Sequence, residues 1–142
     1  MSTDLNDLAE QFRGRKFADL ILFHTNSLDT ETGLKAMVGL LNELPESLSG
    51  PVVELLDFLA AMPQSDAKQF FSGDCSEKLL EVVGLVRGFM LKKQITLSDE
   101  QSFIIFSIIV QNYAHACRTS PQTKSAMQKA SGVGFFGRLF NR

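Results

Sequence analysis

The fold is decided by Phe103-Ile-Ile-Phe-Ser-Ile-Ile-Val110, because seven of these eight residues are apolar. A surface helix would carry a single apolar stripe, and a half-buried strand would alternate apolar with polar residues. This stretch does neither, so we expect it to be covered on all sides. The preceding Ser98-Asp-Glu-Gln101 is typical of a capping box, in which Ser98 and Gln101 satisfy each other's backbone N–H groups. The sequence therefore predicts a buried central helix over about residues 99–118.

Three amphipathic segments precede this helix in the chain. Their apolar faces are formed by Leu34, Met37, Val38, Leu41 and Leu44, by Val52, Leu55, Leu56 and Leu59, and by Leu79, Val83, Val86 and Met90. Pro45 ends the first segment and Ser49-Gly-Pro51 restarts the chain, which predicts an antiparallel pair of helices. Gly84 and Gly88 have the spacing Gly-x-x-x-Gly, and we expect them to let this helix approach the central one closely.

The N-terminal segment predicts a further helix, capped by Thr3 or Ser2. Its apolar line runs through Leu5, Leu8, Phe12 and Phe23 and would also include Lys16. Either the chain bends near Gly14, or Lys16 extends past the edge of the core.

No strand pattern competes with these segments, so the sequence predicts an all-α fold. We expect a single globular bundle of five to six helices around the buried helix at about 99–118, plus a short C-terminal amphipathic segment. The expected division is a helical domain at 1–118, a polar linker or weak helix at 119–131, and an amphipathic basic-aromatic tail at 132–142.

Composition favours a cytoplasmic globular protein. Among its 142 residues, 44% are apolar and 21% are charged, as in ordinary soluble domains. The longest apolar candidate, residues 103–117, is shorter than the roughly 20 residues that cross a bilayer. The acidic N-terminus does not resemble a secretory signal, and Cys75 and Cys117 are too few for a disulfide framework.

The motifs that resemble catalytic or cofactor sites lack their required context. Residues 132–137 match Gly-x-Gly-x-x-Gly, but no strand precedes them, as a dinucleotide site requires. Ser65 and Lys68 match Ser-x-x-Lys, yet a serine after proline at a helix start is typical of a cap. Neither His24 nor His115 follows a glutamate at the spacing of a di-iron site. We therefore predict no enzyme activity, no cofactor and no metal site. The alternative is an enzyme whose residues assemble only in three dimensions.

Charge is distributed unevenly along the chain. Residues 1–118 hold 10 Lys and Arg against 16 Asp and Glu, a net charge of −6, whereas residues 119–142 hold four cations and no acid. The acidic body and the few basic residues of the tail argue against nucleic acid as a partner. The contrast predicts instead that the tail has a partner of its own.

The apolar residues of the tail separate completely from its other residues on a helical wheel at about 100° per residue. One half holds Val133, Phe135, Phe136, Leu139 and Phe140, and the other holds Gly134, Gly137, Arg138, Asn141 and Arg142. An aromatic face opposite arginines, with no acid, is typical of helices that lie in a bilayer interface. The tail resembles the C-terminal membrane-targeting helices of bacterial division proteins such as the division-site-selection ATPase and the actin-like division protein. That resemblance implies attachment to the inner face of the membrane.

We accordingly expect a non-catalytic adaptor that binds an unidentified protein partner and attaches weakly to an anionic membrane surface. The residues predicted to contact the membrane or a partner are Val133, Phe135, Phe136, Arg138, Leu139, Phe140, Arg142, Lys124 and Lys129. The alternatives are that the tail docks on its own domain or that it joins two copies in a homodimer.

Overall fold

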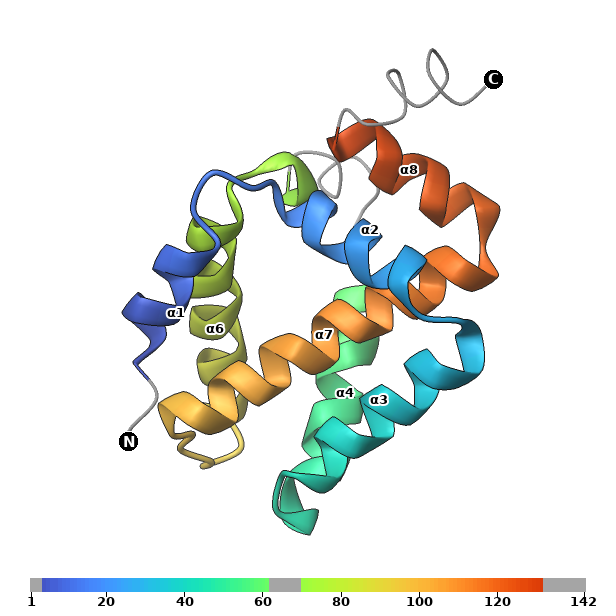
Figure 1. Ribbon diagram of the computed structural model, residues 1–142. Coiled ribbons are helices and arrows are strands. Elements are labelled where there is room, and N and C mark those ends of the chain that lie inside the picture. Colours follow the sequence, from blue (N-terminus) through green and yellow to red (C-terminus); the bar gives the residue numbers. More distant parts are fainter. Residues whose placement is uncertain (1–3, 62–69, 132–142) are drawn as a thin grey trace, which may run out of the picture.

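A computed structural model describes residues 4–61 and 70–131, and these residues form one all-α bundle (Figure 1). Its helices are α1 (Leu5–Gln11), α2 (Phe17–Ser27), α3 (Thr30–Asn42), the 3₁₀ helix η1 (Glu46–Leu48), α4 (Ser49–Ala60), α6 (Cys75–Leu91), α7 (Asp99–Thr119) and α8 (Pro121–Ser131). Residues 70–72 are also helical. Among the described residues, the only β-pairing is an isolated bridge between Lys16 and Asp74. The predicted all-α class is confirmed.

The predicted central helix is α7, which crosses the molecule and contacts α1, α2, α3, α4, α6 and α8 (Figure 1). The Ser98 Oγ accepts the Gln101 N–H at 3.1 Å, and the Gln101 Oε1 accepts the Ser98 N–H at 3.0 Å. The predicted capping box is therefore present. Most of 103–110 is buried, although Phe103 and Ile104 stay partly exposed at the edge of the core.

The core around α7 consists largely of phenylalanine rings. Phe17 of α2 has its ring centroid 5.6 Å from those of Phe70 and Phe71 and 5.8 Å from that of Phe106. Edge and stacked geometries both occur among these pairs, as expected for rings that are held by burial without a polar partner. This cluster joins residues from three distant parts of the chain.

The N-terminal segment breaks at Gly14 into two helices. Gly14 has φ of +86°, a left-handed conformation that favours glycine. Its N–H donates to the Asp74 carboxylate at 2.9 Å, so the loop between α1 and α2 is fastened to the start of α6. Of the two alternatives for this segment, the structure therefore shows the bend near Gly14. The prediction for Phe23 was wrong, because its side chain is 65% exposed on the outer side of α2.

The cap of α1 also differs from the prediction. Asp4 is the N-cap residue, and its side chain accepts the Asn6 N–H at 2.9 Å. Ser2 and Thr3 lie outside the described residues.

Helices α3 and α4 do not form the predicted antiparallel pair. The main packing partner of α3 is α7, and α3 has few contacts with α4. The apolar face of α3 is also turned from the predicted position, because Leu34 and Val38 are exposed while Gly33 is buried. In α4, Ser49 is the first helical residue and provides no side-chain cap, contrary to the prediction.

The first helical residues of α6 are capped by Asp74, which accepts the Ser76 N–H at 2.9 Å. The predicted core positions Leu79, Val83, Val86 and Met90 are all buried. The prediction for Gly84 and Gly88 was wrong: a Cβ at either position would meet open space, so neither allows a close helix approach.

Candidate functional site

The predicted site lies mostly in the tail, and its residues 133–142 are outside the part of the chain that the structure describes. The remaining two predicted residues, Lys124 and Lys129, both lie on α8. Five positions on a helix separate them by about 140°, so they lie on different sides of α8. Lys129 is exposed, whereas Lys124 is half-buried beside Arg118 and Asp29. The structure therefore does not gather these two cations into one patch.

Residues 121–131, expected as a linker or a weak helix, form α8. Ser120 accepts the Thr123 N–H at 3.3 Å, and Pro121 occupies the first turn, where its missing N–H costs nothing. Met127 and Ala130 are buried, and α8 packs against α2 and α7. The helix contains no acidic residue. It is thus a packed element of the bundle that leads directly into the basic tail.

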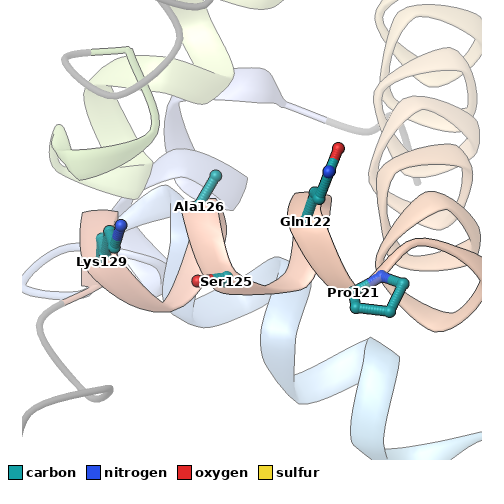
Figure 2. A pocket seen from close by; sticks show the side chains of 5 residues that line it. All are labelled: Pro121, Gln122, Ser125, Ala126 and Lys129. Carbon is teal, nitrogen blue, oxygen red and sulfur yellow. The ribbon is translucent and has the colours of Figure 1, made fainter.

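The outer side of α8 carries a shallow, open groove of about 450 Å³. Figure 2 shows its five lining residues along this one helix: Pro121, Gln122, Ser125, Ala126 and Lys129. Ser125 and Ala126 contribute small side chains to its lining. The proline ring and the methylene stems of Gln122 and Lys129 make its edges largely apolar.

Arg118, at the end of α7, joins three helices. Its guanidinium donates to the backbone carbonyl oxygens of His24 at 2.6 Å and Thr25 at 3.1 Å, near the C-terminus of α2. The same group covers Gly33 of α3, where a Cβ would lie 2.1 Å from the Arg118 Nη1. A cation beside the last carbonyls of a helix is favourable. Arg118 thus has a structural role, which the sequence analysis missed because its partners are backbone atoms.

A separate cavity of about 240 Å³ lies between α2 and α7. Its lining residues are Phe12, Leu20, His24, Phe103, Phe106, Ser107, Val110 and Gln111. Burial lowers the pKa of His24, and the positive charge of Arg118 lowers it further, so the ring is neutral near pH 7. Its Nδ1 lies 3.1 Å from the Gln111 Nε2, which fixes the side chain against α7. Among the described lining residues, His24 has the only ionisable side chain.

The candidate chemical groups elsewhere are dispersed or buried. Cys75 and Cys117 are free and buried, and burial raises the pKa of both thiols. Within 4–61 and 70–131, no three His, Cys, Asp or Glu side chains are placed to share a metal ion. Ser65, Lys68 and residues 132–137 lie outside the described residues.

Several large apolar side chains are exposed on the body, and they are distributed over four helices. They are Phe23 of α2, Leu34 and Val38 of α3, Val53 and Phe58 of α4, and Leu80, Leu85 and Leu91 of α6. The Phe58 ring contacts the Phe89 ring of α6, and the two ring centroids are 5.8 Å apart. Exposed apolar side chains can serve as contacts for a protein partner where they gather into a contiguous patch.

Among the described helices, none combines the length and the hydropathy needed to cross a bilayer. Comparison with known protein families, with curated proteins and with solved structures finds no significant match to this chain.

Proposed function

We propose that this protein is a non-catalytic adaptor of the cytoplasm, with a helical body that binds a protein partner and a tail that attaches weakly to an anionic membrane surface. The observation that carries the proposal is the separation of apolar from basic residues over 133–142, directly after the acid-free helix α8. The exposed apolar side chains of α3, α4 and α6 support the partner-binding role of the body.

The expected attachment is weak because opposing terms nearly balance. Each Lys or Arg close to an anionic surface contributes about 1 kcal/mol, and residues 119–142 provide four. Phe and Leu side chains add at most about 1.5–3 kcal/mol each when fully buried. Ordering the segment costs about 1–2 kcal/mol per fixed residue. Two tails on one particle would therefore bind much more firmly than one.

Sedimentation with vesicles of anionic and of neutral lipid tests the attachment at low salt. The full chain should sediment with the anionic vesicles, and a chain that ends at Ser131 should remain in the supernatant. This truncation keeps α8 and its buried Met127 and Ala130. If the full chain also remains in the supernatant, the membrane proposal is wrong.

A charge-matched pair of variants separates the tail from the body. Arg138→Gln with Arg142→Gln should weaken sedimentation with anionic vesicles, because it removes two cations from the contact surface. Arg15→Gln with Lys92→Gln removes the same charge from exposed positions of the body and should leave sedimentation unchanged. Equal loss in both variants would show that only net charge matters and that the tail is not the contact.

A further inference from the structure

The residues that line the groove on α8 have the spacing of a docking site for another helix. Its residues Gln122, Ser125, Ala126 and Lys129 follow i, i+3, i+4, i+7, so they form one stripe along the outer side of the helix (Figure 2). Ser125 and Ala126 have small side chains, so larger side chains of a second helix could fit between Gln122 and Lys129. Close helix packing places the side chains of one helix into such depressions of the other.

We propose that the chain's own segment 133–142 docks in this groove, and that the docked segment cannot bind the membrane. This inference rests on the proposed function, because the apolar face that would enter the bilayer is the face that would enter the groove. One apolar face cannot be covered by both surfaces at once. Docking in the groove therefore regulates the attachment of the segment to the membrane.

The position of the segment in the chain favours this occupant. Helix α8 ends at Ser131, and the groove runs back along α8 from Lys129 to Gln122. Gly132 and Gly134 lie between the two and can adopt the backbone conformations of a tight reversal. Eight residues of helix, such as 135–142, span about 12 Å at 1.5 Å per residue, which equals the span of Gln122–Lys129. Returning antiparallel along α8, the segment would place Leu139 near Ser125 and Ala126.

Charge determines whether segment 133–142 binds more tightly to the groove or to an anionic membrane. Neither α8 nor residues 132–142 contain an acid, so Arg138 and Arg142 gain no ion pair with α8 in the groove. Seating relies on the apolar contacts alone, whereas an anionic bilayer offers apolar contacts together with opposite charge. An anionic surface should therefore displace the segment from the groove, and a neutral surface should not.

Disulfide trapping tests the seat directly in the full chain. The pair Ala126→Cys and Leu139→Cys should cross-link within one molecule at least about fivefold faster than the pair Ala60→Cys and Leu139→Cys. Ala60 is an exposed alanine of α4 and provides a matched control. The native Cys75 and Cys117 are 0% and 2% exposed and should contribute little background. Equal rates for the two pairs, or a cross-link that joins two molecules, would overturn the proposal.

Vesicle binding tests the regulation. Ala126→Gln places a larger neutral side chain in the lining of the groove, whereas Ala60→Gln makes the same change on α4. Because apparent affinity falls in proportion to the fraction of free segment, Ala126→Gln should raise binding to anionic vesicles at least about threefold, and Ala60→Gln should not change it. If the unmodified chain binds anionic vesicles and Ala126→Gln binds them with the same affinity, the regulatory role is overturned.

The two experiments fail separately. If neither the unmodified chain nor Ala126→Gln binds anionic vesicles, the membrane function is wrong, and withholding is overturned with it. The cysteine pair would still decide whether the groove seats the segment.

Discussion

Replacing Gly33 by alanine should destabilise the fold, although alanine is the better helix former. Gly33 lies in the interior of α3, where Gly→Ala at an unhindered position stabilises by about 0.5–1 kcal/mol. At Gly33, however, the added Cβ would lie 2.1 Å from the Arg118 Nη1 and 2.8 Å from its Cζ. The guanidinium must therefore move, and its bonds to the carbonyl oxygens of His24 and Thr25 resist that movement.

The size of the loss depends on how many of these bonds break. A hydrogen bond from a charged group contributes about 1.5–3 kcal/mol. Losing one bond, against a gain of about 1 kcal/mol from helix propensity, lowers the free energy of unfolding by about 0.5–2 kcal/mol. Losing both lowers it by about 2–5 kcal/mol. Gly33→Ala should therefore be less stable than the unmodified protein by at least about 0.5 kcal/mol.

Urea unfolding followed by circular dichroism measures this difference, and Gly39→Ala provides the control. Gly39 lies in the same helix with open space around its Cα, so the same substitution there should stabilise by about 0.5–1 kcal/mol. In an Arg118→Met background, Gly33→Ala should lose most of its penalty, since the displaced guanidinium is gone. If Gly33→Ala is as stable as Gly39→Ala, the contact between α3 and Arg118 does not hold the helices as described.

Two further predictions concern α6 and the buried thiols. Hydrogen bonds from Ser76 and from the Gly14 N–H lower the pKa of Asp74 below its usual 3.8, so its stabilising effect is present above that value and disappears as pH falls through the lowered pKa. Asp74→Ala should therefore lower the urea midpoint at pH 7 and converge with the unmodified protein in strong acid; a constant difference at all pH values would contradict this. Burial raises the pKa of Cys75 to about 11 and also raises that of Cys117, so both thiols should resist a thiol reagent at pH 8 until urea unfolds the chain. Fast labelling of the native protein would show that the thiols are accessible.

Local signals in the sequence predicted the parts of the fold that depend on local interactions. The capping box at Ser98 and Gln101 involves residues three apart, and it is present. The bend near Gly14 was one of two alternatives, because the apolar line carried straight through would include Lys16. What fastens that bend, the Asp74 carboxylate on the Gly14 N–H, joins residues sixty positions apart and leaves no local pattern.

The candidate site was predictable only as a segment. The separation of apolar from basic residues over 133–142 can be read from residue order alone, whereas the groove of α8 depends on which side of that helix faces the bundle. Buried Met127 and Ala130 fix that orientation, and they leave Ser125 and Ala126 outward. A polar segment with few large side chains gives a weak pattern, so the sequence allowed a linker as well as a helix.

The rotation of α3 shows why hydropathy alone misplaced its buried face. Averaging the positions of Leu34, Met37, Val38, Leu41 and Leu44 places the centre of the face between Met37 and Leu41. In the structure the buried side instead follows Gly33, Met37, Leu40 and Leu44, and Leu34 and Val38 turn outward. Gly33 permits this because the Arg118 guanidinium occupies the space of its missing side chain. A glycine has no apolar side chain, so a hydropathy pattern cannot predict whether it lies on the buried or on the exposed face of a helix. The contact at this position is thus made by a residue without a side chain and by a charged residue, and neither contributes to an apolar pattern.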